Sequence, residues 1–411
     1  SYYSSGQRLP DYMNPHQCNI TGTTNDEFAE YYTFNDDDNF NTYLGDNVNY
    51  DTFILSNNVF LSGAYRNNTF GGNVVGNTFD EDMDSNIVGP YFQYNIITDD
   101  FDGNNVGSYF QYNIIDCDME SNQIGNYFES NMLGDSDGND FDFNQIGSYF
   151  NSNFLTLNYD FYGNNIGESF YNNIIDSEFR NNTIVGNFNL NLFINNYFND
   201  NFIGNDFYGN TIPTSFYSNN IGDNFDTNTI YFEFRKNSIL NGFNLNTIGG
   251  VDNLGLLFEN NQIMNNFKGN DIQGDFWSNQ IKTDFKGNDI FEEFGYNNIG
   301  FGCSPNSFSG ITTHNNIGDN FSFNTCYGSF SYNTIGTYFN SNDVQDGFGF
   351  GASSSQGNRI GNDFTDNTIG EYFYNNIIPD NFYNNTIGDS FQWNIVNTEV
   401  NNVCLSTGML Y

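Results

Sequence analysis

Apolar residues recur along this chain at spacings that alternate between five and four residues. The pattern is clear in two interleaved sets, Phe92, Phe101, Phe110, Met119 and Phe128, and Ile97, Val106, Ile115 and Ile124. A helical period of 3.6 residues cannot sustain this alternation, and the frequent Gly and Asn disfavour helix interiors. The pattern therefore predicts short strands separated by bends.

The strands belong to a nine-residue repeat, Asn-x-Ile-Gly-x-x-Phe-x-x. Clear copies are residues 122–128, 367–373 and 385–391. A short fixed period indicates stacked copies of one small unit, each burying its apolar face against the next. Asn tolerates left-handed backbone angles and bonds nearby backbone groups, so we expect the repeated Asn at the bends, stacked as an amide ladder.

The nonapeptides alternate in character, which sets the size of a coil. One kind reads Val-Gly-Ser-Tyr-Phe at residues 106–110, and the other reads Ile-Ile-Asp-Cys-Asp-Met at 114–119. Nine residues are too few to surround a core, so each coil needs two nonapeptides, with about 18 residues and two unlike sides. The predicted fold is an all-β parallel β-solenoid, a rod of roughly nineteen coils rising ~4.8 Å each.

Departures from the repeat fall at residues 133–140, 250–257, 303–314 and 349–358. We expect an irregular N-terminal cap or attachment segment at 1–60 and a β-solenoid of nonapeptide repeats at 61–400. A C-terminal cap at 401–411 would cover the last coil, because an open solenoid end invites aggregation. The start at Ser1, without Met, fits a processed product or a piece of a longer chain.

Composition excludes several classes of partner. Lys and Arg number 9 against 50 Asp and Glu, a formal net charge of −41. Nucleic acids and anionic lipids are bound through clustered cations, so neither is expected as a partner. No run of ~20 apolar residues is present, so we expect no membrane insertion.

The five Cys include no Cys-x-x-Cys pair, which argues against zinc and thioredoxin-like sites. Cys326 takes an Ile position of the repeat and Cys303 a Phe position. Both fit buried small apolar residues, and a Cys303–Cys326 disulfide is the alternative.

One kind of nonapeptide carries an acid immediately before its core residue, at Asp100, Asp118, Asp140, Asp160 and Glu178. Stacked ~5 Å apart, such carboxylates repel by about 1 kcal/mol per pair even in water-like surroundings. The column is therefore either a solvated acidic face or a metal site. Calcium, which accepts flexible oxygen ligands, is the candidate ion.

Tyr side chains precede the core Phe of the other kind, at Tyr91, Tyr109, Tyr127 and Tyr149. An outward aromatic ladder suits sugar rings or a second chain, and stabilising pairs between coils are the alternative. Lys268 and Lys286, eighteen residues apart, should be neighbours. They would pair with Glu259, Glu292 or Glu293, or contact an acidic subunit.

Catalysis finds little support in the sequence. The two His, His16 and His314, lack partners at spacings typical of a triad or a metal site. Carboxylate pairs suited to glycoside hydrolysis arise by chance among fifty acids. We therefore expect no enzymatic activity.

Residues 361–364, Gly-Asn-Asp-Phe, resemble the calcium-binding nonapeptide repeats of secreted bacterial toxins. The Gly-Gly-x-Gly-x-Asp turn of that family is missing, so its ligand positions do not transfer. Residues 74–400 more closely resemble the Asn-x-Ile-Gly-x-x-Phe repeat proteins of phages, giant viruses and environmental bacteria. That resemblance implies a fibre-like role on a virion or cell surface, and it implies no catalytic residues.

The expected function is a structural or adhesive fibre component on a virion or cell surface, presenting a rigid acidic rod. Its expected partners are other copies of itself, fibre or surface proteins, and glycans, in an extracellular setting. Alternatives are a subunit of a self-assembling extracellular filament, a polysaccharide-degrading tailspike and an ice-binding protein. Ice binding would need ranked Thr, whereas Thr211, Thr229 and Thr247 look scattered.

Overall fold

The computed structural model describes residues 65–396, with the exception of 68, 81, 135–138, 157–159, 195–196, 250–256, 350–356, 371, 379 and 389. Outside this range it describes only the backbone of a few short strands. The chain divides into two compact units, Ser1–Gly204 and Asn205–Tyr411. The expected caps at 1–60 and 401–411 lie outside the described residues, apart from the backbone of strands such as β3 (Asn49–Tyr50) and β66 (Cys404–Leu405).

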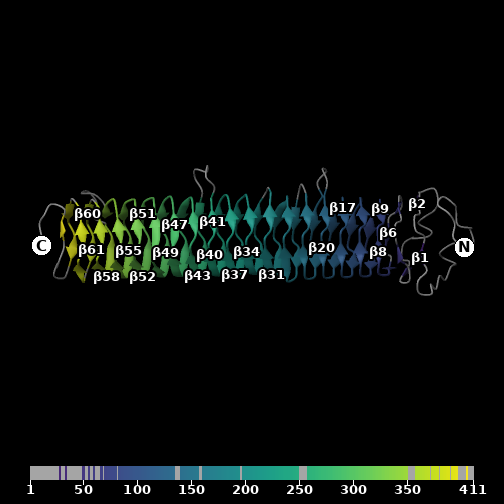
Figure 1. Ribbon diagram of the computed structural model, residues 1–411, viewed down its shortest axis with the longest axis horizontal. Coiled ribbons are helices and arrows are strands. Elements are labelled where there is room, and N and C mark those ends of the chain that lie inside the picture. The colour runs from purple at the N-terminus through teal and green to yellow at the C-terminus, as the bar shows by residue number, and fades with distance from the viewer. Residues whose placement is uncertain are drawn as a thin grey trace, which may run out of the picture. The chain divides into compact units, whose positions relative to one another are not determined.

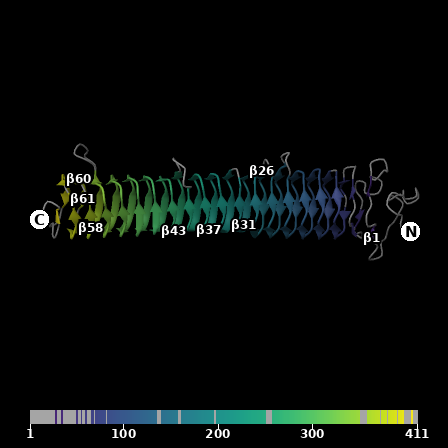
Figure 2. The same cartoon turned by 45° about the horizontal axis from the view of Figure 1, so that its top comes forward.

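Every regular element in the described part of the chain is a β-strand, and the strands pair in parallel (Figures 1 and 2). Each unit is therefore a parallel β-solenoid, as the sequence predicts. The described residues contain no helix long and apolar enough to cross a membrane.

A coil of unit 1 has four sides. One coil consists of β14 (Phe101–Asp102), β15 (Asn105–Val106), β16 (Phe110–Gln111) and β17 (Ile114–Ile115), which we call sides I to IV in that order. Each strand pairs with the strand eighteen residues on; Phe110, for example, is in register with Phe128 of β20 (Phe128–Glu129). The coil length is as predicted, but each nonapeptide forms two sides, so the expected two-sided coil is wrong.

The core of unit 1 consists of two facing stacks of aromatic rings. On side III the Phe110 and Phe128 ring centroids are 5.0 Å apart and nearly parallel. Across the core, Phe128 meets Phe141 of side I at 5.9 Å and 66°, edge to face. Val106 and Ile115 fill sides II and IV and are almost completely buried. Offset stacking and edge-to-face contact are both favourable for aromatic rings, so the 18-residue period suits a Phe core.

Two columns of buried Asn residues hold successive coils together. In Asn113 the side-chain Nδ2 donates to the Phe92 carbonyl at 3.1 Å and to Asn131 Oδ1 at 3.0 Å. Its Oδ1 accepts from the Asn95 backbone N–H at 2.9 Å and from Asn95 Nδ2 at 3.3 Å. All four hydrogen-bonding positions of the amide are thus used, which removes the cost of burying it.

The bend itself is formed by a different residue from the one expected. The left-handed residue is the one immediately before almost every ladder Asn, for example Tyr94 (φ 56°) before Asn95 and Ser121 (φ 59°) before Asn122. The ladder Asn therefore contributes hydrogen bonds rather than left-handed angles. Gly107, at the bend between sides II and III, is needed for another reason, because a Cβ there would lie 2.7 Å from the Pro90 nitrogen.

The ladders bridge three of the four sequence departures. Asn131 and Asn153, twenty-two residues apart, are bonded through the Asn131 N–H and Asn153 Oδ1 at 2.9 Å. The bond from Asn246 to Asn270 spans twenty-four residues and the bond from Asn333 to Asn358 spans twenty-five. Insertions therefore leave the stacking of the coils intact.

From β31 (Thr183–Asn189) onward, sides II and III merge into one longer strand in most coils. A coil there consists of β37 (Asn220–Asp226), β38 (Thr229–Ile230) and β39 (Phe234–Arg235). Within β37 the bend is marked by Asn224 (φ 58°). Aromatic stacking continues, with Phe225 and Phe243 centroids 4.9 Å apart.

Residues 303–314, predicted to depart from the repeat, keep its geometry. Cys303 is in register with Phe285 and Phe321, and Thr312 with Phe294 and Phe330. Two Phe positions thus hold smaller side chains in this coil. Phe308, in register with Ile290, fills the space by stacking between the side III rings, 6.3 Å from Phe285 and 6.2 Å from Phe321.

Cys326 occupies an Ile position, in register with Phe308 and Val344. Cys303 and Cys326 are both fully buried free thiols. Their expected role as small apolar core residues is therefore confirmed, and the alternative of a disulfide is wrong.

The Asn ladder should be intolerant of loss of its donors. Asn122→Asp removes the Nδ2 bonds to the Phe101 carbonyl and to Asn144 Oδ1 while keeping the side-chain shape. We expect it to lower the free energy of unfolding by about 3 kcal/mol or more, because it leaves buried acceptors unpaired. Asn105→Asp, at an exposed position of the preceding coil, is the control and should have little effect in chemical denaturation.

The compensation around Phe308 predicts strong non-additivity. Cys303→Phe alone should overpack the core, and Phe308→Ile alone should leave a cavity, each costing about 1–3 kcal/mol. The triple variant Cys303→Phe, Phe308→Ile and Thr312→Phe restores the arrangement of the preceding coil and should recover wild-type stability or exceed it. If the single variants lose stability and these losses simply add in the triple variant, the result would contradict this packing.

Candidate functional site

The predicted acidic residues form a continuous column on side I of unit 1. Asp118 Oδ1 accepts the backbone N–H of Asp140 at 2.9 Å, and Asp140 Oδ1 accepts that of Asp160 at 3.3 Å. Asp160 is in turn in register with Glu178, and Asp100 precedes them in the same column. Through each bond a carboxylate accepts the backbone N–H of the next acid in the column, and this hydrogen bond favours the charged form of the carboxylate.

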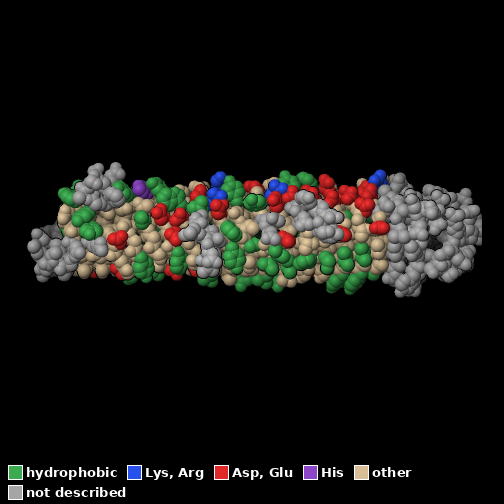
Figure 3. Space-filling model, turned by 90° about the horizontal axis from the view of Figure 1, so that it is seen from above, with side chains coloured by type: hydrophobic (Ala, Val, Ile, Leu, Met, Phe, Trp, Pro, Cys, Tyr) green, Lys and Arg blue, Asp and Glu red, His purple; other side chains and the backbone are tan. Residues whose placement is uncertain are grey.

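A second acidic column, which the sequence analysis did not single out, runs beside the first. It consists of the residue after each core side chain, at Asp84, Asp102, Glu120 and Asp142. Asp102 Oδ1 accepts the Glu120 backbone N–H at 2.8 Å. The signal was available, since each of these acids directly follows a core residue of the repeat. Figure 3 shows acidic side chains gathered along the upper edge of the N-terminal half of the view.

Arginines close both ends of the two columns. Arg66 lies 3.0 Å from Asp82 and 3.0 Å from Asp84 at the N-terminal end. Arg180 donates to Asp160 Oδ2 at 2.6 Å and lies 3.0 Å from Glu178 at the C-terminal end. These exposed pairs contribute little stability individually, and they neutralise only the ends of the array.

In the middle of the two acidic columns, the pKa values of several carboxyl groups are raised instead. Partial burial, helped by the negative charges of Asp100 and Asp84, raises the pKa of Asp102 to about 6. Partial burial and the charge of Asp140 raise the pKa of Asp142 to about 7. Desolvation also raises the pKa of Asp100 and of Asp140. Proton uptake therefore relieves part of the repulsion that the sequence predicts.

The donor set meets only part of the requirement for a calcium site. Ligand oxygens of Asp82, Asp99 and Asp100 lie within 4.8 Å of one another. Calcium takes six to eight oxygen ligands, so these three would leave the remainder to water. Asp118, Asp140, Asp160 and Glu178 continue the column but do not join this group. The predicted metal role stays a prediction.

The four predicted tyrosines stack directly on one another at the bend before side III. Adjacent ring centroids are 4.7 Å apart for Tyr91–Tyr109 and 4.8 Å for Tyr109–Tyr127 and Tyr127–Tyr149, each with an interplanar angle of 4°. The faces of the inner rings are covered by their neighbours, so the ladder presents ring edges and hydroxyls. A sugar ring stacks on an aromatic face, so the geometry favours stabilising pairs between coils over glycan stacking.

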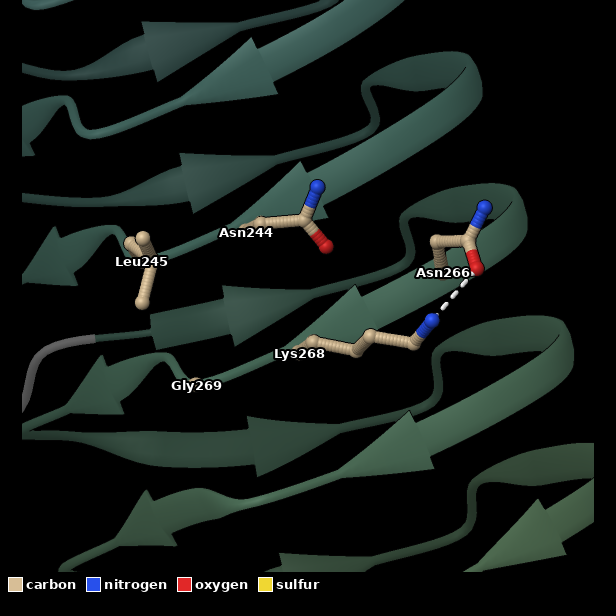
Figure 4. Close-up of a pocket in the computed structure, with 5 residues that line it drawn as sticks. All are labelled: Asn244, Leu245, Asn266, Lys268 and Gly269. Carbon is tan, nitrogen blue, oxygen red and sulfur yellow. Dashed lines mark hydrogen bonds between the residues drawn. The ribbon is translucent and has the colours of Figure 1, made fainter.

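The cations of unit 2 are paired differently from expectation. Lys268 and Lys286 are neighbours in register, as predicted. Lys286 pairs with Asp284 at 3.1 Å, and Lys268 donates to Asn266 at 2.8 Å, so neither uses Glu259, Glu292 or Glu293. Lys268 lines an open hollow of about 450 Å³ with Asn244, Leu245, Asn266 and Gly269 (Figure 4).

Side IV differs most between the two units. From Ile96 to Leu192 its outward residues in unit 1 are apolar, at Ile96, Ile114, Met132, Phe154, Ile174 and Leu192, and we call this set the apolar stripe. In unit 2 the equivalent column holds Thr211, Thr229 and Thr247 in register, followed by Asp271. The Thr residues are therefore aligned, and the expectation that they are scattered is wrong. They form a single column, interrupted by acids.

His314 lies in a stack of aromatic rings. Its ring is parallel to Tyr296 at 4.6 Å and to Tyr332 at 4.7 Å. His16 lies outside the described residues.

The fold and these surfaces define the class of the protein, a repeat β-solenoid with eighteen-residue coils. A comparison with protein-family models, curated proteins and solved structures finds no match to the chain. The likeness to phage, giant-virus and bacterial repeat proteins therefore remains a resemblance in motif.

The raised pKa values predict that acid stabilises unit 1. Asp102 and Asp142 bind protons more tightly in the folded chain than in the unfolded chain. Their stabilising contribution to the free energy of unfolding is fully present below pH ~4 and is lost as pH rises through about 6 to 7. We expect the melting temperature at pH 5 to exceed that at pH 8 by a few degrees.

Asp102→Asn with Asp142→Asn should raise the melting temperature at pH 8 and flatten this dependence. Asp319→Asn is the control, because the Thr337 backbone N–H lowers the pKa of Asp319, so its titration lies below this window. A wild-type melting temperature that rises from pH 5 to pH 8 would contradict the assignment.

Proposed function

We propose that the chain is a structural and adhesive fibre component, acting outside cells on a virion or cell surface. The observation that supports this role most directly is that the buried polar side chains bond successive coils to one another. Buried Asn side chains in both units bond to the next coil, as in Asn279, whose Nδ2 donates to the Phe258 carbonyl at 2.8 Å and to Asn297 Oδ1 at 3.1 Å. The buried hydrogen bonds of the repeat therefore serve to stack one coil on the next.

The surface chemistry agrees with this role. Unit 1 presents two acidic columns on side I and an uncharged apolar stripe on side IV. Among the described residues, the hollow at Lys268 is open to solvent, and the Lys268 side chain donates to Asn266 there. A protein that carries specialised faces on a repetitive support is suited to assembly and contact with surfaces.

A subunit of a self-assembling extracellular filament is the second candidate. The apolar stripe favours it, because exposed contiguous apolar surface is typical of protein interfaces. The two roles differ in whether the protein forms long assemblies by itself.

Electron microscopy separates these roles. Immunogold labelling of the native source should place the protein on projections of a particle or a cell envelope, and the purified chain should form no long polymers. Long unbranched filaments grown from the purified chain alone would favour the filament role. Label confined to the cell interior would contradict both.

A further inference from the structure

The apolar stripe on side IV of unit 1 is a surface feature that the fold does not require. Its six side chains point away from the core, in strands β13 (Ile96–Ile97), β17, β21 (Met132–Leu133), β25 (Phe154–Leu155), β29 (Ile174–Ile175) and β32 (Leu192–Phe193). Unit 2 builds the same side with Thr, Asp and Ser in that column. Apolar residues here therefore serve something other than coil formation.

The stripe is regular and substantially exposed. Ile114 is 45% exposed and Met132 is 48% exposed. Exposed Tyr94, Tyr112, Leu190 and Ile194 extend it at its margins. Together these ten side chains offer on the order of 700 Å² of apolar surface, close to what one partner contributes to a standard protein interface. Figure 3 shows hydrophobic side chains gathered along the edge opposite the acidic one in the N-terminal half of the view.

We propose that the apolar stripe binds the same stripe of a second copy of this chain. Successive stripe residues lie in register on hydrogen-bonded strands, so they repeat at the strand spacing of ~4.8 Å. A second copy supplies the same spacing, and two such sheets pack face to face about 10 Å apart. The pairing is isologous, because one patch meets itself about a twofold axis.

The acidic columns determine the direction of the second copy. Side I adjoins side IV, so each copy carries its acids along one flank of the stripe. A twofold axis parallel to the coil axis places the two acidic flanks on opposite edges of the interface. An antiparallel arrangement would place both on the same edge, within reach of unscreened repulsion. The two copies therefore run parallel, and each stripe residue faces its own equivalent.

This inference rests on the structural role proposed above and names the surface that serves it. Analytical ultracentrifugation of the full chain tests it at micromolar to submillimolar concentrations. The wild type should sediment as a dimer. The variant Ile114→Thr, Met132→Thr and Phe154→Thr, which uses the residue found at this column in unit 2, should weaken dimerisation at least tenfold.

Two controls keep the test decisive. Circular dichroism should show the triple variant folded like the wild type, since Thr already occupies this position at Thr78 and Thr211. Leu245→Ser with Phe323→Ser removes exposed apolar surface from unit 2 and should leave the dimer unchanged. A monomeric wild type, or a dimer that the triple variant leaves intact, would overturn the inference.

The orientation has its own test, by cross-linking with a short bifunctional thiol reagent in a background with Cys18→Ser and Cys404→Ser. Ile114→Cys alone should cross-link two copies if they run parallel. In an antiparallel dimer, residue 114 of one copy would face residue 174 of the other, so cross-linking would need Ile114→Cys together with Ile174→Cys. Cross-linking of this double variant without cross-linking of the single variant Ile114→Cys would overturn the parallel arrangement. Because microscopy tests location and these experiments test association, failure of one can be told from failure of the other.

Discussion

The hydrogen bond from one buried Asn side chain to the Asn above it is the interaction on which the rest of this structure depends. Each coil is only eighteen residues long and cannot fold alone, because most of its contacts are with the coils before and after it. An amide has two donor and two acceptor positions, and a ladder of equivalent amides satisfies all four, as Asn113 does. Burial then costs little and fixes the register.

Once the ladders and Phe stacks set the register, other positions become free to vary. The left-handed bend before each ladder Asn accepts residues as different as Tyr94, Ser121 and Lys236. Whole segments can be inserted, as between Asn246 and Asn270, without loss of the ladder bond. Outward columns can therefore specialise, which is how unit 1 carries acids on side I and apolar residues on side IV.

The sequence predicts the solenoid, the coil length and the buried Asn because these follow from spacing alone. It does not predict the four-sided coil, because spacing does not say how many bends a nonapeptide makes. Phe308 illustrates a further limit, since its compensation for Cys303 and Thr312 becomes visible only when the three positions are placed in one layer. The sequence makes that stretch look like a break in the repeat.

The acidic surface was predictable in part. Asp118 and Asp140 were found because each directly precedes a core residue of the repeat, whereas Asp102 and Asp142 each directly follow one. Partial burial, which raises the pKa of Asp142 to about 7, depends on packing and is invisible in the sequence. The apolar stripe was not singled out, although the repeat places Ile97 in the core and alternation along a strand then places its neighbour Ile96 on the surface.

Amide hydrogen exchange of the native protein tests the central role of the Asn ladders most directly. The backbone N–H of Asn95 donates to Asn113 Oδ1, and the N–H of Asn122 donates to Asn144 Oδ1. The account predicts that these amides exchange as slowly as the strand amides of the Phe core, with protection recurring at each ladder Asn. Ladder amides that exchange as fast as exposed bend residues, while the strands stay protected, would contradict it.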